Sequence, residues 1–330
     1  MRPQKPSAIL RCSGTQAFLV TDLTNILYLS GVSMSAGFML ITPRKMLLFA
    51  DSRYAEIAQK TAGDCVTVLS PDLLGKSLAS YRQCGCEADS VTLAQFGRWK
   101  RKFKNTKFVQ KTGVIEEFRR SKSQDELRKF RKAQEITHDI IARVPRVLKD
   151  GESELKVAEK LRSWALQLGA QELAFEPIVA FGTHSSRPHH RPTSRTLRMG
   201  NVVQIDVGAR YEGYAADQSA FFFTGSPTPK QSRAYEAVRK AKDAAVALVR
   251  PGVSTHALDE AARNVLRDYD MEEAFTHALG HGLGLDVHEG VTVSGRAQEK
   301  YLLKGEIITI EPGVYFAGQF GIRLEEEVVV

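Results

Sequence analysis

Three histidines lie within a short glycine-rich stretch, HALGHGLGLDVHEG, at residues 277–290. Histidine is a common metal ligand and carries protons near neutral pH, so the stretch indicates a chemical site. His277 and His281 are four residues apart, and on a helix they could bind one zinc ion together. The three interleaved glycines disfavour a helix and no glutamate follows His277. We therefore expect a loop in which the backbone can pass close to metals and substrate.

Two aspartates make a second candidate feature. The stretch NVVQIDVGARYEGYAADQSAFFF, residues 201–223, predicts a β-hairpin with Asp206 in one apolar strand and Asp217 in the other. A turn centred near residue 211 or 212 would place the two aspartates nearly opposite each other, with Cβ atoms about 4.5–5.5 Å apart. Two buried carboxylates so close must share a proton or be neutralised by a metal. The alternative, one aspartate in the turn and one facing solvent, fits less well because both lie inside apolar runs.

A pair of glutamates repeats this arrangement near the end of the chain. In ITIEPGVYFAGQFGIRLEEEVVV, Glu311 ends one apolar strand and Glu325 lies in the next, with a turn expected at Gly318. Strand alternation places Glu325 and Glu327 on one face and Glu326 on the other, but it does not choose between the first two. An exposed acidic strand end is the alternative interpretation.

Four carboxylates with a nearby histidine form a ligand set for two divalent metal ions. Oxygen-rich coordination with one imidazole suits manganese, cobalt or iron(II), and zinc is possible. Two ions that share carboxylates can bind one water between them, lower its pKa and stabilise a developing oxyanion.

The elements that must position these residues divide the chain into two parts. The first part predicts an α/β unit with a helix over residues 52–63. Its expected short strands lie at residues 17–21, 37–42 and 45–50. A helical pattern then begins at Glu116, with a capping box at Ser123 and Glu126 and an interruption expected at Pro145. We place the domains at residues 1–118 and 119–330.

The second part mixes helices and strands. Thr228 and Gln231 form another capping box, which predicts a helix to about Val249. Ser254 is expected to cap the next helix, to about Asp268. Strand character occurs at residues 176–182, 201–208, 214–223, 305–311 and 321–330.

Composition narrows the class of protein. The 330 residues are more than one core usually supports, and 43% hydrophobic with 25% charged residues is typical of a globular protein. No apolar run approaches the roughly 20 residues that span a membrane, and the basic start lacks the apolar stretch of a signal peptide. We therefore expect a cytoplasmic protein without a membrane partner.

The cysteines and the charge offer two weaker signals. All four cysteines are expected to be free thiols, although Cys84 and Cys86 could form a redox or metal pair. The net charge is +8, and much of the excess lies in RWKRKFKNTK, residues 98–107, which contains two aromatic residues. Such a run could bind nucleic acid, but a solvated charged face is the commoner explanation, and we expect no nucleic-acid partner.

The combined pattern resembles the pita-bread metallopeptidases, and among them the Xaa-Pro peptidases, aminopeptidase P and prolidase. The matching stretches are IDVGARYEGYAAD, THALGHGLGLDVHEG, TIEPGVYF and GIRLEEE. ILYLSGVSMSAGFMLIT and LLFADSRYAEIA are similar to the amino-terminal domain of those enzymes, and EEFRRSKSQDELRKFRKAQEIT to their linking helix. The resemblance implies an α/β (α+β) chain. In it, a creatinase-like domain precedes a pita-bread catalytic domain with a curved antiparallel sheet and flanking helices.

The resemblance also implies a role for each candidate residue. The implied metal ligands are Asp206, Asp217, His281, Glu311 and Glu325, with Asp217 and Glu325 bridging two ions. Glu311 would also relay the proton of the attacking water, and His288 would stabilise the tetrahedral intermediate. The implied pocket residues are His277, His189 and Arg323, where His189 lies seventeen residues before Asp206. His189 is also counted among the catalytic residues, and Arg323 would pair with ligand carboxylates or with substrate.

Some positions depart from the family pattern. His190 stands where a small or aromatic residue is usual, and Ser219 and Ala220 stand where threonine and arginine are usual. These changes put the pocket shape and the rate in doubt more than the chemistry. The chain also ends at Val330, inside an expected strand, so both a truncated and a naturally short form are open.

The predicted function is hydrolysis of the bond between an N-terminal residue and proline, by an Xaa-Pro aminopeptidase with two divalent ions, foremost Mn²⁺. A tertiary Xaa-Pro amide lacks an N–H, so a dedicated pocket is expected. An Xaa-Pro dipeptidase is the alternative, and the shapes of loops 183–200 and 312–322 would decide between them. The expected partners are peptides with proline second and another copy of the chain in a homodimer. A non-catalytic binding module and a nucleic-acid-binding protein are the competing classes.

Overall fold

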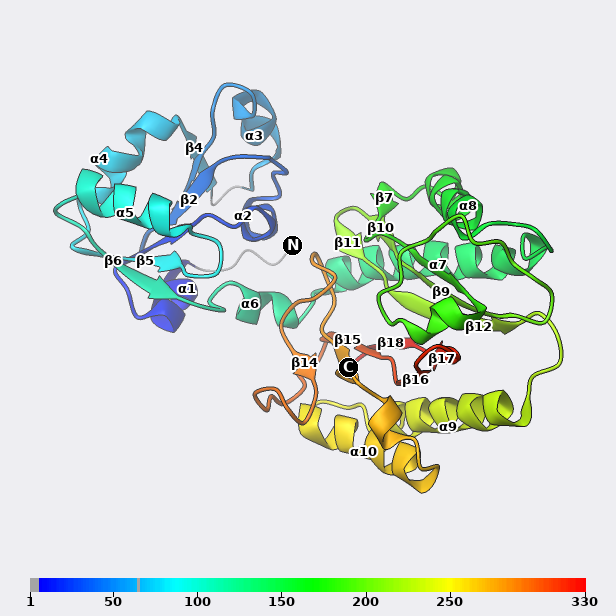
Figure 1. The fold of residues 1–330 in the computed structure, drawn as a ribbon. Coiled ribbons are helices and arrows are strands. Elements are labelled where there is room, and N and C mark those ends of the chain that lie inside the picture. Colours follow the sequence, from blue (N-terminus) through cyan, green and yellow to red (C-terminus); the bar gives the residue numbers. More distant parts are fainter. Residues whose placement is uncertain (1–5, 64–65) are drawn as a thin grey trace. The chain divides into compact units, whose positions relative to one another are not determined.

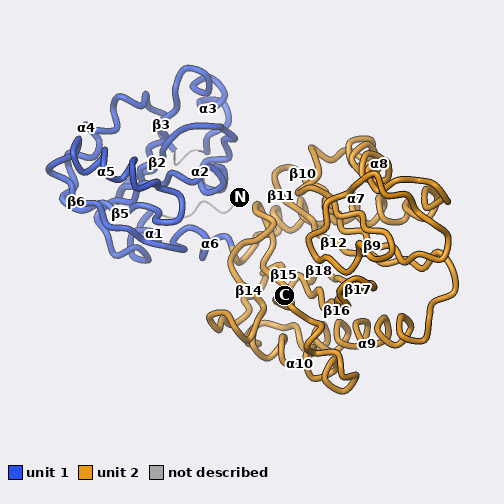
Figure 2. Tube along the Cα trace, viewed as in Figure 1, with its two compact units in different colours: residues 1–119 blue, residues 120–330 orange. Residues whose placement is uncertain are grey.

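The chain forms two compact units, residues 1–119 and 120–330, each with its own core (Figures 1 and 2). The computed structural model describes residues 6–63 and 66–330, and the two units are described separately. Within the described residues, no helix has both the length and the apolar character needed to cross a membrane.

Unit 1 is built on a six-stranded mixed sheet in the order β4-β3-β2-β1-β5-β6. Its strands are β1 Ala17–Val20, β2 Phe38–Ile41, β3 Met46–Phe49, β4 Val66–Leu69, β5 Gln83–Glu87 and β6 Lys107–Lys111. Its helices are α1 Pro6–Ser13, α2 Leu23–Ser30, α3 Ala55–Thr61, α4 Leu74–Leu78 and α5 Leu93–Lys102, with a 3₁₀ turn at Pro71–Leu73. The three strands and the helix that the sequence predicts in this part are confirmed.

The core of unit 1 contains Cys84, Cys86 and Trp99, three residues that could have indicated a redox, metal or nucleic-acid site. Cys84 and Cys86 are buried free thiols on β5, and Cys12 is an exposed one, whereas Cys65 lies outside the described residues. In the basic run, Trp99 is only 6% exposed and packs with the core. A buried ring cannot stack on a nucleic-acid base, so the basic side chains of the run form a charged face around a buried aromatic anchor.

Three helices of unit 2 begin at the capping residues that the sequence indicates, Ser123, Thr228 and Ser254. The short helix α6, Glu116–Arg120, leads from unit 1 into α7, Gln124–Arg143, which starts at the capping box of Ser123 and Glu126 and ends before Pro145. The other long helices are α8 Glu154–Gln167, α9 Pro229–Val246 and α10 Thr255–Asp268, with 3₁₀ turns at Val144–Arg146, Gly182–Ser186 and Glu272–Ala274. The Thr228–Gln231 capping box is present, and α9 ends three residues before the expected Val249.

The strands of unit 2 pair antiparallel in several short sheets. They are β7 Glu172–Leu173, β8 Ile178–Phe181, β9 Val202–Val207, β10 Ala209–Tyr211, β11 Tyr214–Ala215, β12 Gln218–Phe223, β13 Gly280–His281, β14 Thr292–Val293, β15 Ile307–Ile310, β16 Gly313–Phe316, β17 Phe320–Arg323 and β18 Glu326–Val329. Apolar residues of α7 and α8 pack against β8 and β9, and those of α9 and α10 pack against β15 to β17. The strands therefore lie between two helical layers (Figure 1).

Candidate active site

The first pair of predicted carboxylates lies on the hairpin β9–β12, but not directly opposite each other. Asp206 pairs with Ser219, and Asp217 immediately precedes β12. The turn residues Glu212 and Gly213 both adopt left-handed backbone conformations, with φ of 43° and 85°. This two-residue turn is centred one residue later than the sequence suggested, which shifts the register by two residues. Because the shift is even, the two aspartates remain diagonal neighbours on the same face.

The second pair lies where two strand ladders meet. The register of β15–β18 and that of β16–β17 both continue to Glu311 opposite Glu325, with the turn at Gly318 in the left-handed region, as expected. Both glutamates lie in the gap between the ladders rather than within a strand. Oxygens of Asp206, Asp217 and Glu325 all come within 4.8 Å of one another, so the two hairpins meet at one buried cluster.

The two glutamates that follow Glu325 point elsewhere. Glu326 forms an ion pair with Lys242 of α9. Glu327 is buried, and its Oε1 accepts a hydrogen bond of 2.7 Å from the Asp217 amide. The structure therefore brings Glu325 to the carboxylate cluster, and places Glu327 behind Asp217, a choice that alternation alone did not make.

His281 joins the cluster from β13, which is a short strand and not a helix. Its Nε2 lies 3.5 Å from Asp217 Oδ2 and 3.3 Å from Glu311 Oε1. A Cβ added at Gly280 would stand 1.9 Å from the Thr309 carbonyl oxygen, and one at Gly282 would stand 2.0 Å from that of Glu289. The glycines thus allow close packing of backbone on backbone, which brings His281 to the carboxylates.

Charge is strongly uneven within the cluster. Burial, and next the neighbouring charge of Asp217, raise the pKa of Glu325 well above its usual range. Burial, and next the charge of Asp206, raise the pKa of Asp217 to about 7. Burial alone would lower the pKa of His281, but its contacts with Asp217 and Glu311 raise it to about 10. Burial would likewise raise the pKa of Glu311, and the contact with His281 lowers it to about 2.

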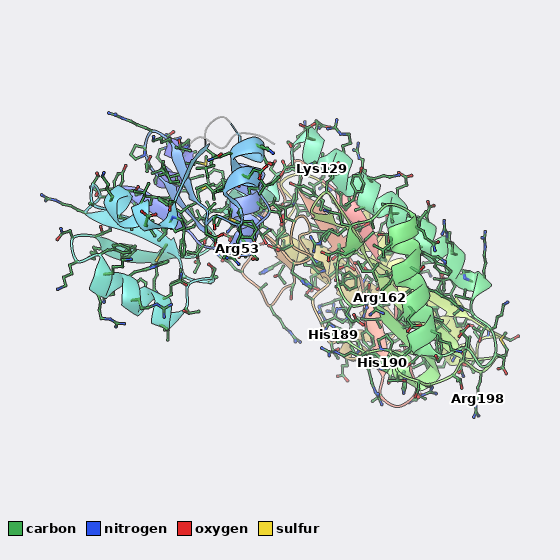
Figure 3. All side chains as sticks on the ribbon, turned by 90° about the horizontal axis from the view of Figure 1, so that it is seen from above. Arg53, Lys129, Arg162, His189, His190 and Arg198 are labelled. Carbon is green, nitrogen blue, oxygen red and sulfur yellow. The ribbon has the colours of Figure 1, made fainter. Side chains whose placement is uncertain are left out.

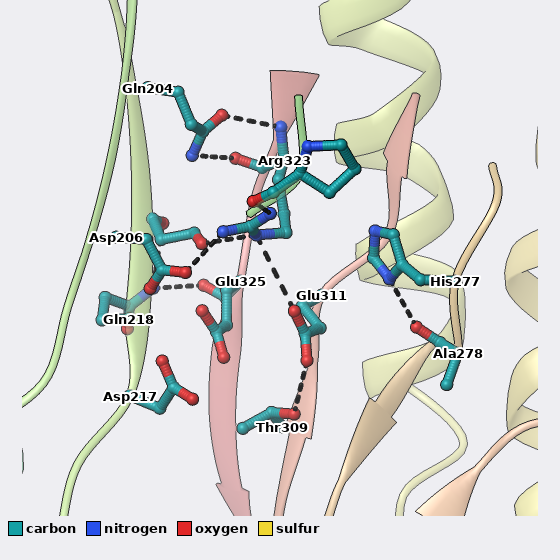
Figure 4. Close-up of polar contacts among 12 residues, drawn as sticks. Gln204, Asp206, Asp217, Gln218, His277, Ala278, Thr309, Glu311, Arg323 and Glu325 are labelled. Carbon is teal, nitrogen blue, oxygen red and sulfur yellow. Dashed lines mark hydrogen bonds and ion pairs between the residues drawn. The ribbon is translucent and has the colours of Figure 1, made fainter. Parts of the chain in front are cut away.

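Arg323 supplies the cation of the cluster (Figure 4). It is buried, and its guanidinium forms an ion pair with Asp206 and lies 3.7 Å from Glu311 Oε2. Its Nη1 also donates to the Tyr315 hydroxyl, at 3.0 Å. His277 Nε2 lies 3.0 Å from the same hydroxyl. Arg323 therefore contacts two carboxylates, Asp206 and Glu311, and the Tyr315 hydroxyl at the same time.

A cavity of about 640 Å³ opens beside the cluster. Every site residue predicted from the sequence lines it except Glu325, which lies against the lining aspartates. His288 packs its ring 4.0 Å from that of His281, and burial followed by the charge of His281 lowers its pKa. Burial also lowers the pKa of His277. Both imidazoles are therefore neutral at pH 7 and can donate or accept a hydrogen bond.

The residues present fit divalent metal ions. Among the described residues, Asp206 Oδ1 and both carboxylate oxygens of Glu325 are buried without a hydrogen-bond partner. Buried carboxylate oxygens without donors are costly unless a cation meets them. A set of four carboxylates and one imidazole matches the ligands of manganese, cobalt or iron(II).

Several residues that support the site carried no clear sequence signal. The Tyr315 hydroxyl links His277 to Arg323. The Gln204 side chain donates a hydrogen bond to the Arg323 carbonyl and accepts one from the Arg323 amide. Ser219 accepts a 2.8 Å hydrogen bond from Arg323 Nε, so a residue that departs from the family pattern is part of the network. These partners come from separate strands, and their spacing in sequence follows no period that reasoning could use.

Comparison with known proteins identifies the family to which the chain belongs. The sequence matches the model of metallopeptidase family M24 over residues 128–330. It also matches the model of the creatinase/prolidase N-terminal domain over residues 2–121. The fold and site are those of a metal-dependent peptide hydrolase. The chain belongs to metallopeptidase family M24, and this membership implies divalent metal ions.

Individual relatives are similar to this protein along nearly the whole chain. It is 33% identical to an Xaa-Pro dipeptidase of Pyrococcus horikoshii, over 95% of this chain and 90% of that relative. It superposes on an Xaa-Pro dipeptidase from Bacillus anthracis with a TM-score of 0.95 at 26% identity, over 99% of this chain and 94% of the other. It superposes on an X-Pro aminopeptidase from Thermotoga maritima with a TM-score of 0.88 at 32% identity, over 98% and 94%. The expected creatinase-like domain followed by a pita-bread catalytic domain is confirmed.

Proposed function

We propose that the chain hydrolyses the peptide bond between an N-terminal residue and proline, with Xaa-Pro dipeptides as its main substrates. The observation that carries the proposal is the buried carboxylate cluster with His281 beside a cavity lined by four further histidines, His189, His190, His277 and His288. Relatives named as Xaa-Pro dipeptidases support the substrate class. A tertiary Xaa-Pro amide offers no N–H, which suits a dedicated cavity better than a groove that pairs with an extended strand.

The proposed ligands of two divalent ions are Asp206, Asp217, His281, Glu311 and Glu325, with Mn²⁺ as the first candidate metal. When bound, such ions polarise the scissile carbonyl and lower the pKa of the attacking water. Asp217 and Glu325 are the proposed shared ligands, which agrees with their raised pKa values: burial raises the pKa of each, and repulsion from a neighbouring carboxylate, Asp206 for Asp217 and Asp217 for Glu325, raises it further. Two cations would replace that repulsion by attraction.

The remaining site residues act on substrate and protons. Glu311 is the proposed proton relay, because its carboxylate lies at the cavity and contacts His281. His288 is proposed to donate a hydrogen bond to the oxygen that becomes negative, and its lowered pKa keeps it neutral at pH 7. His277, held by Tyr315, and His189 form the proposed walls of the substrate pocket. Arg323 holds Asp206 and Glu311 in place.

The cavity also offers a cation for a substrate carboxylate. Arg191 lines the cavity and is exposed. Among the described residues it has no ion-pair partner, whereas the other lining arginine, Arg323, is buried and committed. A dipeptide places its negative charge one residue beyond the scissile bond, so a free guanidinium at the wall supports a dipeptidase.

The second candidate is an Xaa-Pro aminopeptidase that accepts longer peptides. The likeness to the Thermotoga maritima enzyme, at 32% identity, favours it. The deciding experiment compares kcat/KM of the Mn²⁺-loaded protein for Gly-Pro, Ala-Pro and a longer Xaa-Pro peptide. A preference for dipeptides supports the main proposal, and a preference for the longer peptide supports the second. Full activity after exhaustive chelation would contradict both.

A substitution sharpens this comparison. Arg191→Gln should raise KM for Ala-Pro by about tenfold, because a lost charge-assisted hydrogen bond costs about 1.5–3 kcal/mol. The same variant should leave KM for Ala-Pro amide unchanged. Arg198→Gln is the matched control, because Arg198 lies on the same loop, is exposed and does not line the cavity. Equal effects on the acid and the amide would refute the role of Arg191.

We also propose the domain limits, the location and the oligomeric state of the protein. The domain limits are residues 1–118 and 119–330, the chain acts in the cytoplasm, and it forms a homodimer that binds neither nucleic acid nor membrane. Light scattering during gel filtration measures the oligomeric state directly, and a monomer at micromolar concentration would contradict the dimer.

A further inference from the structure

Glu154, at the start of α8, is a buried carboxylate outside the proposed metal cluster. Glu154 is the first residue of this helix and is 0% exposed. Its Oε1 accepts a hydrogen bond of 2.9 Å from the Phe181 amide and lies 2.9 Å from His184 Nδ1. Its Oε2 accepts hydrogen bonds of 3.0 and 2.7 Å from the amide and hydroxyl of Thr193, and lies 3.0 Å from His190 Nε2. Both oxygens are therefore fully occupied.

These partners come from the two ends of one segment, residues 181–193. Phe181 and His184 are near its start, and His190 and Thr193 are at its end. The rings of His184 and His190 also pack 4.4 Å apart. One carboxylate thus draws the two ends of the segment together and fixes the loop between them.

The middle of the same segment forms part of the active-site wall. Pro188 and His189 line the cavity, together with His190, which also contacts Glu154, and Figure 3 shows His189 next to His190, close to α8. The Pro188 carbonyl accepts a hydrogen bond of 3.2 Å from Arg323 Nη1. The Ser185 hydroxyl accepts one of 2.9 Å from the Gly321 amide on β17. The segment therefore connects Glu154 to the cavity and to the cation of the cluster.

The same three side chains could be taken for a metal site, since ligand atoms of Glu154, His184 and His190 lie within 4.8 Å of one another. The hydrogen bonds of these side chains argue against a metal site. Both carboxylate oxygens accept from backbone donors of the protein, and none of the three side chains has a buried polar atom left without a partner among the described residues. The pKa of Glu154 points the same way, because burial would raise it but the donors from His190 and Phe181 lower it.

We propose that Glu154 is a positioning residue of the active site, which holds His189 in the cavity wall by fixing both ends of the segment 181–193. The inference rests on the proposed function, because the role of His189 belongs to it. Glu154 does not line the cavity and lies outside the carboxylate cluster. It acts through the segment, so its removal should misplace His189 while leaving the metal ligands intact.

The test is a double-mutant cycle with Glu154→Gln and His189→Ala, assayed on Ala-Pro with Mn²⁺. Glu154→Gln alone should lower kcat/KM by about 10- to 100-fold, since a misplacement of about 1 Å at a site costs up to that much. Its metal content should equal that of the wild type. In the His189→Ala background the same substitution should cost less than threefold, because the group through which it acts is gone. An equal loss in both backgrounds, or loss of metal on Glu154→Gln, would overturn the inference.

Two further variants guard the interpretation. Glu152→Gln is the matched control, since Glu152 lies two residues earlier and pairs with Lys160 at the surface, and it should behave as wild type. Thr193→Val removes one donor and keeps the side-chain shape, so it should repeat the effect of Glu154→Gln at about two- to fivefold. If Glu154→Gln fails to fold, this variant carries the cycle, and its independence of His189 would then overturn the inference.

A spectroscopic readout separates this inference from the proposed function. In protein labelled with ¹³C-histidine, the ring signal of His189 is assigned by its loss in His189→Ala. It should move in Glu154→Gln and stay in place in Glu152→Gln, whether or not Xaa-Pro peptides are cleaved. A wild type without Xaa-Pro activity would refute the proposed function, and an unmoved His189 signal would refute the positioning role. Stoichiometric zinc that is lost on His190→Gln would show a metal site instead.

Discussion

Among the buried carboxylates of unit 2, Glu154 and the cluster around Asp217 differ in the number of hydrogen-bond donors that meet them. Glu154 accepts hydrogen bonds at both oxygens, and its donors hold its pKa below the usual range. The cluster of Asp206, Asp217 and Glu325 has oxygens without donors, and burial with mutual repulsion raises the pKa of the last two. A buried carboxylate with enough donors builds structure, whereas one without them is kept for a ligand. Donor supply, rather than burial, distinguishes the two roles.

The largest effect is expected in the cluster. Asp217→Asn should reduce bound metal and bring Xaa-Pro activity to background, because it removes the proposed bridging ligand. In the presence of chelator the same variant should be more stable than the wild type by about 2 kcal/mol at pH 7, because repulsion among carboxylates is relieved. Metal analysis and urea unfolding measure the two outcomes. Glu326→Gln, whose side chain pairs with Lys242, is the control, and unchanged metal in Asp217→Asn would contradict the cluster.

At Glu154 the same kind of substitution should have the opposite sign. Glu154→Gln should lower the free energy of unfolding by about 3 kcal/mol, because an amide nitrogen would face buried donors. Glu152→Gln should change it by about 0.5 kcal/mol or less, since its ion pair is at the surface. Urea unfolding of the three proteins in chelator tests this, and a Glu154→Gln variant as stable as wild type would remove the contrast between the two groups.

The pH dependence should separate the two groups once more. The pKa of Glu154 is lowered on folding from 4.5, so its contribution is complete above pH 4.5 and is lost as the pH falls through the lower folded value. The pKa of Asp217 is raised from 3.8 to about 7, so its cost is absent below pH 3.8 and grows up to about pH 7. The deficit of Glu154→Gln should therefore be complete at neutral pH and shrink at acid pH, whereas the advantage of Asp217→Asn should develop toward neutrality. Unfolding curves at several pH values in chelator would show it; parallel pH profiles would contradict it.

The smallest effect concerns a single donor. Thr193→Val removes one of the hydrogen bonds to Glu154 and should cost about 1 kcal/mol. Thr183→Val is its control on the same segment, because Thr183 is exposed and accepts only a surface hydrogen bond from Arg195. The two variants are compared by thermal unfolding, and equal stabilities would mean that the hydrogen bond from the Thr193 hydroxyl to Glu154 contributes nothing to stability.

Local features of the fold were predictable because they depend on neighbours in sequence. The capping boxes at Ser123 and Thr228 need only residues three apart, and both are present. The pairing of Glu311 with Glu325 followed from a turn at Gly318. The register of Asp206 and Asp217 was displaced by two residues, because the sequence does not show that Glu212 adopts a left-handed conformation.

The tertiary part of the site could not be predicted in this way. No sequence pattern distinguished Glu154, and nothing in its neighbourhood indicates donors from residues 181–193. The cross-links of Arg323 to Gln204 and Ser219 join strands more than a hundred residues apart. Such contacts depend on how the layers pack, and a single sequence carries no period that reports them.

The turn at Glu212 and Gly213 has a consequence for the search for distant relatives. Strand faces alternate with every residue, so one added or deleted residue in this turn would rotate Asp217 to the opposite face and dismantle the cluster. The ten residues between Asp206 and Asp217 therefore form an interval whose length is fixed by the position of the cluster. A pattern that keeps this interval and relaxes the identities between its ends should find homologues that pairwise identity has lost.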